Sequence, residues 1–114
     1  MKVRYLKPIL AIVATASLTM MVSALPSFYT AFSKNYDLKD GSHLQKAKCL
    51  ICHATAKGGK ALNPYGKDVQ KELKAEHLHK VTDAVLKAVE PLDSAGTGST
   101  NIKRIKADQL PGGN

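Results

Sequence analysis

The residues most able to do chemistry stand together in the run Cys49-Leu50-Ile51-Cys52-His53, which holds the only two cysteines of the chain. On a helix, positions i, i+3 and i+4 share one face, so both sulfurs and the imidazole point the same way. Two sulfurs at this spacing can bond the two vinyl groups of a haem, and the adjacent histidine then lies under the iron as its proximal ligand. The run predicts one covalent haem c.

Two other chemistries use the same residue types. A redox-active C-x-x-C pair belongs in a βαβ setting, which this sequence does not predict. A structural zinc site needs four ligands. The motif supplies three, and His43, His77 or His79 would supply the fourth. Zinc binding therefore stays open as an alternative.

The motif is expected on a helix, because no segment alternates apolar and polar residues as a strand does. Ser42 with Gln45 three residues later is a capping-box pattern. It predicts a helix from His43 that carries the cysteines and ends near Gly58-Gly59. Residues 58–66 are expected to form a turn-rich loop.

Three further helices follow from apolar spacing. Tyr65, Val69 and Leu73 recur every four residues and predict a helix from about 67 to 76. Another helix is predicted over 82–90, with Thr82 as its N-cap and valines 81, 85 and 89 as its apolar stripe. A short fourth helix is expected near 101–108. The predicted fold class is all-α.

Residues 1–24 are predicted to be a secretory signal peptide. Three cations, Lys2, Arg4 and Lys7, precede an uncharged stretch over 8–33, and Val-Ser-Ala at 22–24 has the small-x-small pattern of a cleavage site. An uncleaved anchor is the alternative, since such a run can span a bilayer. The protein is thus expected outside the cytoplasm, in the bacterial periplasm, with membrane contact only if this segment is retained.

The exported part is divided here into a connector, 25–41, and a domain, 42–114. Without the first three cations the chain has 14 basic and 9 acidic residues, a net charge of +5, which two haem propionates would lower to about +3. The lysines are spread and not interleaved with arginines and aromatics, so nucleic-acid binding is not expected. They form either a solvated face or a surface that steers the protein toward an acidic redox partner.

The motif and its surroundings resemble small bacterial monohaem cytochromes c. The resemblance is carried by 47–53, Gly58-Gly59-Lys60 and the run 62–68, Leu-Asn-Pro-Tyr-Gly-Lys-Asp, and it covers most of 44–113. The tail, with Leu92-Asp93-Ser94 and Leu110-Pro111-Gly112, is similar to the Asp-rich loop and Leu-Pro-Gly ending of some members. This resemblance implies a cytochrome c-like helical fold and electron transfer in the periplasm.

The resemblance also implies ligands around the iron. The proximal histidine of such domains often donates its second ring nitrogen to a proline carbonyl in the following loop, and Pro64 matches that proline. The usual sixth ligand is a methionine, but all three methionines lie within residues 1–21. The distal candidates are therefore His77, His79, His43, a lysine, water or no ligand. His77 continues the spacing of the 65–73 stripe and would face inward if that helix persists.

The segment 93–104 has the length of an EF-hand calcium loop, with Asp93 at position 1 and Gly98 at position 6. The other positions depart from that pattern, since Ala95, Thr97 and Arg104 stand at positions 3, 5 and 12. A cation at position 12 opposes calcium binding. We expect a degenerate loop that has lost its ion.

These observations predict a one-electron carrier that holds one haem c. The alternative from another class is a haem-based gas-binding or sensory module with an open distal site, and a zinc-binding structural domain is the third reading. The chain is too short for a dedicated substrate pocket beside a haem, so an enzyme is not expected.

Overall fold

The computed structural model describes residues 27–113 of the chain. They form five α-helices and one 3-10 turn, and this part of the chain contains no strand. The predicted all-α class is confirmed for these residues. The predicted signal segment, 1–24, lies outside them. Each helix of the described part falls short of the length and apolar character that a membrane span requires.

The first helix, α1 (Ser27–Asn35), occupies most of the predicted connector. Phe32 on this helix is 2% exposed and belongs to the hydrophobic core, and other aromatic residues of the same segment pack against it. The segment predicted as a connector, 25–41, thus contains a helix that packs on the core. The aromatic cluster of this segment is the apolar face of a helix.

The second helix, α2 (His43–Ala47), begins as predicted, because the Ser42 side chain accepts a hydrogen bond from the Gln45 backbone at 3.2 Å. It ends after five residues and passes into a 3-10 turn, η1 (Lys48–Ile51). The prediction of one helix as far as 58–59 was wrong beyond Ala47. Lys48 adopts a φ of 48°, which an α-helix does not allow.

The remaining helices are α3 (Pro64–Ala75), α4 (Asp83–Val89) and α5 (Asn101–Lys106). α3 begins three residues earlier than predicted, because Asn63 caps it and proline suits the first helical position. The predicted stripes of α3 and α4 are buried as expected. The core consists of eleven apolar side chains: Phe32, Leu44, Ile51, Tyr65, Val69, Leu73, Val81, Val85, Leu86, Val89 and Ile105.

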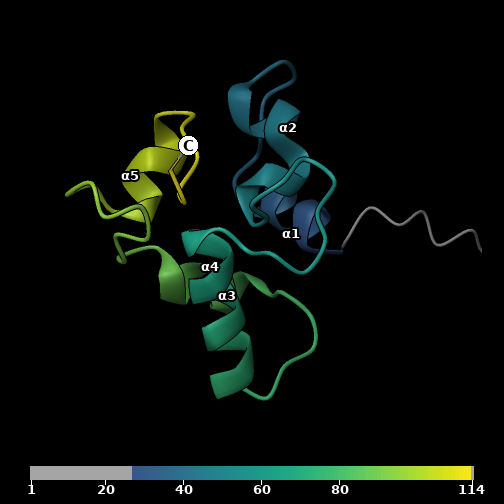
Figure 1. Ribbon diagram of the computed structural model, residues 1–114. Coiled ribbons are helices and arrows are strands. Elements are labelled where there is room, and N and C mark those ends of the chain that lie inside the picture. The colour runs from purple at the N-terminus through teal and green to yellow at the C-terminus, as the bar shows by residue number, and fades with distance from the viewer. Residues whose placement is uncertain (1–26, 114) are drawn as a thin grey trace, which may run out of the picture.

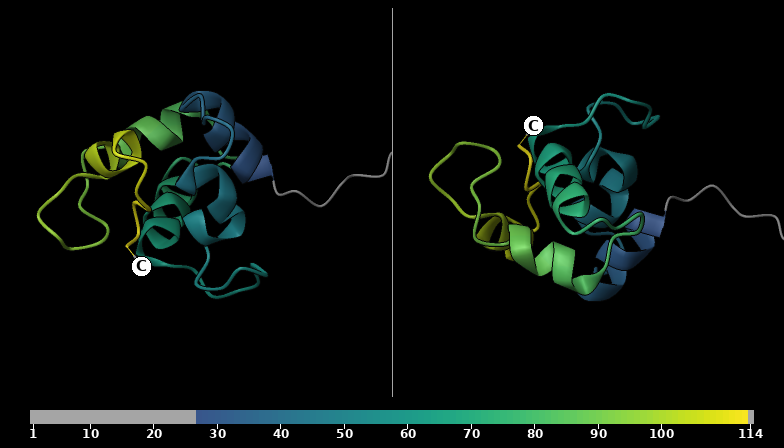
Figure 2. Two further views of the ribbon diagram at one scale, coloured as in Figure 1. Left: turned by 90° about the horizontal axis from the view of Figure 1, so that it is seen from above. Right: turned by 90° about the horizontal axis from the view of Figure 1, so that it is seen from below.

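The helices surround this core without forming a layered sheet or a long bundle. Figure 1 shows α1 and α2 on one side of the molecule and α5 on the other, with α3 and α4 together below them. α3 packs against α4, and α1 packs against both α4 and η1. In both views of Figure 2 the loop before α5 extends away from the helices. The turn η1, which begins the cysteine motif, thus follows α2 and packs against α1.

Candidate functional site

The two cysteines and the histidine lie on one tight turn of the backbone. The Cys49 carbonyl accepts hydrogen bonds from the Cys52 backbone at 3.2 Å and from the His53 backbone at 2.8 Å. All three residues are partly buried, and the two cysteines are not joined by a disulfide. The expected α-helix is absent here, and a 3-10 turn with the two residues that follow it carries the motif instead.

Asn63 joins this turn to the start of α3. Its side-chain nitrogen donates to the carbonyls of Leu50, at 2.8 Å, and Ile51, at 3.0 Å. Its side-chain oxygen accepts from the Gly66 backbone at 2.8 Å. One amide thus satisfies both the turn and the helix N-terminus. This role of Asn63 was not predicted from the sequence, although an asparagine before a proline is a recognisable helix start.

Gly66 allows α3 to lie directly on the motif. A β-carbon at this position would stand 2.0 Å from the Cys52 carbonyl oxygen, closer than any side chain can approach. That same oxygen accepts a hydrogen bond from the Asn63 backbone at 2.9 Å. The close contact between helix and motif therefore requires glycine, which explains its place in the 62–68 run.

A closed loop covers one side of His53. The Ala54 backbone donates to the Ala61 carbonyl at 3.0 Å, and His53 forms an isolated antiparallel bridge with Leu62. The backbone of Gly58 folds back toward the histidine, so that a β-carbon there would lie 3.9 Å from two atoms of its ring. The Thr55 hydroxyl donates to the Gly58 carbonyl at 3.0 Å, which holds this glycine beside the ring.

On another side, the motif borders an apolar cavity of about 140 Å³. Cys52 and His53 line it together with side chains from α1, α3 and the closed loop. The apolar members are Phe28, Leu62, Val69 and Leu73. A second, much smaller cavity lies beside Phe28 and is lined by Cys49, Cys52 and His53. The chemically active residues therefore face a surface suited to an apolar group.

The electrostatic setting keeps the buried groups uncharged. Burial, with a smaller effect from the nearby Cys49, raises the pKa of the Cys52 thiol to about 12. Burial also raises the pKa of Tyr65, which is fully buried behind the motif. A thiol with a raised pKa is a poor attacking thiolate, so the Cys52 sulfur is held as the protonated thiol at neutral pH.

The Nδ1 atom of His53 is buried and has no hydrogen-bond partner in the described part of the chain. Buried polar atoms in native proteins are paired almost without exception. The bond expected from the histidine to the Pro64 carbonyl is not formed, and Pro64 is instead the first residue of α3. The ring therefore has unused polar capacity beside an apolar cavity, which fits a bound prosthetic group.

The first two distal candidates, His77 and His79, line neither cavity beside the motif. α3 ends at Ala75, so the condition that would turn His77 inward is not met, and both His77 and His79 are exposed. His77 has a φ of 53°, and the Leu78 backbone after it donates to the Leu73 carbonyl at 2.9 Å. This is a Schellman ending. The residue terminates the helix.

The third candidate, His43, is exposed at the start of α2. It lines a surface cleft with Lys46, Arg104 and Asp108, and it does not line the cavities around His53. The described residues thus bring none of the three remaining histidines into the cavities that border the motif.

The loop 93–104 is held by internal contacts. The Asp93 carboxylate accepts from the backbones of Gly98, at 2.7 Å, and Thr97, at 3.0 Å, and these bonds lower its pKa. The Arg104 guanidinium donates to the Leu110 carbonyl at 2.7 Å and reaches the Thr97 hydroxyl at 3.5 Å. The cationic side chain at position 12 thus faces the loop where an EF-hand presents a glutamate.

Within residues 27–113, no three histidine, cysteine, aspartate or glutamate side chains converge as metal ligands would. A preformed zinc site at the motif would need such a group, whereas haem attachment asks for two separated sulfurs and a single imidazole. Comparison of the chain with family models, with curated proteins and with solved structures finds no match. The assignment therefore depends on the residues of the site.

Proposed function

We propose that the protein is an exported one-electron carrier with one haem c attached at Cys49 and Cys52 and ligated by His53. The observation that supports this most strongly is that both cysteines and His53 line one small cavity, with a buried, unpaired His53 nitrogen beside a larger apolar cavity. A bound haem supplies the redox-active iron. The resemblance of the motif and its surroundings to small monohaem cytochromes c favours the same assignment.

The chain's own residues would act in three ways. Each thiol would add its sulfur and hydrogen across one vinyl group, forming a thioether without any oxidant. His53 would give a ring nitrogen to the iron, with its ring held by the loop that closes at Ala54 and Ala61. Phe28, Leu62 and Val69 would keep water from one side of the site, which lowers the reorganisation that accompanies a change of iron charge.

A gas-binding or sensory haem module is the second candidate, and one observation favours it. His77 and His79 are exposed and line neither cavity beside the motif, and every methionine lies within residues 1–21. A haem without a strong sixth ligand keeps an open position for small gases. Ligation by His77 or His79 would require the segment after α3 to rearrange.

The decisive experiment is a visible spectrum and an intact mass of the purified, exported protein. We expect a mass equal to the chain plus one haem, and an absorbance band that stays with the polypeptide after denaturation. The double variant Cys49→Ala/Cys52→Ala should lose the covalent haem. The control is His43→Ala, which removes an exposed histidine outside the motif and should retain the haem. A colourless protein with the mass of its bare amino acids would disprove the assignment.

The same spectrum separates the two haem functions. Sharp bands in the reduced protein indicate six-coordinate iron and support the electron carrier. Broad bands that shift on addition of carbon monoxide indicate an open site and support the gas-binding module. His77→Ala and His79→Ala then test the distal side, because only a ligand to iron would change the bands when removed.

A further inference from the structure

The three tyrosines that the structure describes differ in the partner of the phenol. The Tyr36 hydroxyl donates to the Glu90 carboxylate at 3.0 Å, whereas the Tyr29 hydroxyl donates to the backbone carbonyl of Gln45 at 3.2 Å. The Tyr65 hydroxyl is buried and has no partner in the described part of the chain. A carboxylate can take up a proton, while a neutral backbone carbonyl only shares one. Among these three tyrosines, Tyr36 is therefore the one with a base at hydrogen-bond distance.

The base matters when the phenol is oxidised. A phenol that loses one electron becomes a strong acid, so its proton must leave with the electron. A base that takes a proton lies within about 2.6–3.2 Å of the donor, and the distance from Tyr36 to Glu90 falls in this range. Burial, followed by the hydrogen bond to Glu90, raises the pKa of Tyr36, so the phenol keeps its proton until it is oxidised.

One aromatic ring connects this pair to the motif. The ring centroid of Phe32 lies 4.8 Å from that of Tyr36. Phe32 is 2% exposed, and it lines the small cavity that both cysteines and His53 border. Aromatic rings in contact let an electron move in short steps. Phe32 thus spans the distance between the cysteine turn and the Tyr36 phenol.

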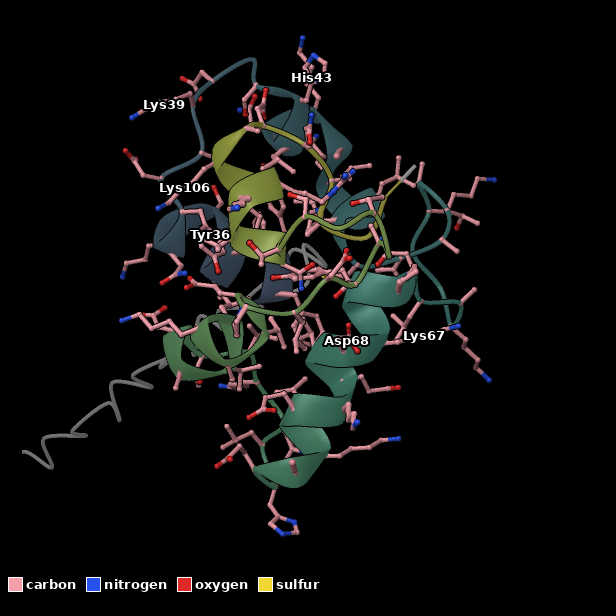
Figure 3. The ribbon with its side chains drawn as sticks, turned by 90° about the vertical axis from the view of Figure 1, so that its left-hand side faces the viewer. Tyr36, Lys39, His43, Lys67, Asp68 and Lys106 are labelled. Atoms are coloured by element: carbon pink, nitrogen blue, oxygen red, sulfur yellow. The ribbon has the colours of Figure 1, made fainter. Side chains whose placement is uncertain are left out.

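The phenol lies at a partly exposed edge of the fold. Tyr36 follows α1 directly and Glu90 follows α4, and these two helices pack against each other. In Figure 3 Tyr36 lies on the same side of the view as Lys106, across from Lys67 near the start of α3. Tyr36 and Glu90 are both partly exposed, so small molecules in solution can approach them.

We propose that Tyr36 and Glu90 form a redox-active pair that returns one electron, through Phe32, to a haem that a peroxide has oxidised. This inference rests on the proposed haem at the cysteine turn. In the step the O–H bond of Tyr36 breaks, its electron reduces the oxidised haem, and its proton forms an O–H bond with the Glu90 carboxylate. Tyr36 is left as a neutral phenoxyl radical. A small reductant in solution then supplies one electron, and Glu90 returns the proton.

Nearness to the motif alone would favour other tyrosines. Tyr29 itself lines the small cavity beside Cys49, and the ring centroid of Tyr65 lies 6.1 Å from that of Phe32. Neither hydroxyl has a carboxylate partner in the described residues. The proposal therefore predicts that Tyr36 is oxidised in preference to both.

The test identifies which tyrosine carries the radical. An equimolar amount of hydrogen peroxide is added to the purified, exported protein with a nitroso spin trap, and mass spectrometry of its peptides locates the label. We expect the label on Tyr36. Glu90→Gln keeps an oxygen at the end of the side chain but cannot take the proton, so it should lower this labelling by at least about tenfold. Tyr29→Phe, the control on the same helix, should leave the labelling of Tyr36 unchanged.

A second oxidant does not need the haem. Photogenerated tris(bipyridine)ruthenium(III) takes one electron from a partly exposed phenol directly. Glu90→Gln should again lower the labelling of Tyr36, because the base is missing with either oxidant. Phe32→Leu should lower the labelling with peroxide and leave it unchanged with the ruthenium complex, which also shows that this variant keeps Tyr36 and Glu90 in place.

The outcomes separate this inference from the proposed function. A coloured protein that is labelled mainly at Tyr29 or Tyr65, or equally in wild type and Glu90→Gln, would overturn the redox-active pair and leave the haem assignment intact. Equal labelling by peroxide in wild type and Phe32→Leu would overturn the route through the ring. A colourless protein would overturn the proposed function and, with it, the return of an electron to a haem.

Discussion

Two residues beside the motif, Asn63 and Gly66, hold its backbone in place, a role that their residue types alone do not predict. Asn63 satisfies the carbonyls of Leu50 and Ile51 with one end of its amide and the N-terminus of α3 with the other. Gly66 removes the one side chain that would separate α3 from Cys52. Both residues act on the geometry of the cysteine turn without touching the proposed haem iron.

Gly66→Ala should therefore be among the most damaging small substitutions in the chain. The added methyl group would stand 2.0 Å from the Cys52 carbonyl oxygen, so the helix must move off the motif. We expect a loss of about 3 kcal/mol in the free energy of unfolding, measured by urea denaturation.

Gly59→Ala is the control for that substitution. Gly59 lies in the loop that follows the motif and has a φ of 87°. A β-carbon added there would have no atom within 4 Å. Its replacement should cost only the backbone strain, about 1 kcal/mol. Equal losses for the two variants would show that the contact with Cys52 does not limit stability.

At the scale of elements, three helices end at a residue in the left-handed region that is not glycine: Asp37, His77 and Asp108. Asp108 has a second role, since its carboxylate accepts from the backbones of Leu44, at 3.0 Å, and His43, at 2.8 Å. One residue thus ends α5 and caps the start of α2. The C-terminal part of the chain thereby helps to fix the helix that leads into the motif.

This cap predicts a dependence of stability on pH. The bond from Leu44, followed by that from His43, lowers the pKa of Asp108 below its ordinary value of 3.8. A lowered carboxyl pKa adds stability above pH 3.8, and that stability is lost as the pH falls through the lower, folded-state pKa. We expect the urea midpoint of wild type to fall more between pH 7 and pH 3 than that of Asp108→Asn. Parallel curves would contradict this role of the cap.

The contacts of the loop 93–104 predict that calcium does not change the stability of the protein. Arg104 holds the loop to the tail through Thr97 and the Leu110 carbonyl, and its charge opposes a second cation. Added calcium at millimolar concentration should leave the melting temperature unchanged. Arg104→Gln should lower it, because the bond to Leu110 is lost. A rise in the melting temperature of wild type with calcium, absent with magnesium, would show that the loop still binds its ion.

At the scale of the whole molecule, the described chain has a small core. Eleven buried apolar side chains hold five short helices, and chains of this size are only marginally stable without a staple. A covalent haem would add a large apolar surface beside the cavity that α1 and α3 line. The cofactor is therefore expected to contribute to folding as well as to electron transfer.

The haem-loaded protein should accordingly melt at a higher temperature than Cys49→Ala/Cys52→Ala. We expect a difference of about 2 kcal/mol, or about 10 °C for a domain of this size. Differential scanning calorimetry of the two proteins measures it, with His43→Ala as a variant that keeps the haem. Equal melting temperatures would mean that the chain completes its core without the cofactor.

The sequence by itself determined the features that depend on local patterns. The all-α class, the cap at Ser42 and the buried stripes of α3 and α4 follow from spacing of apolar residues and from cap chemistry, which act within one or two turns. The grouping of Cys49, Cys52 and His53 is equally local. Their chemistry remains a prediction, since it is inferred from residue type and spacing.

Only the tertiary structure decided where helices stop and which distant residues meet. No glycine marks the end of α3, so the outward position of His77 depends on a Schellman ending that its residue type does not signal. The break of α2 at Lys48 accompanies the bonds from Asn63, which come from beyond the motif. Contacts between distant segments compete with local helix propensity, and their free energies are comparable, so the sequence pattern alone cannot tell which will prevail.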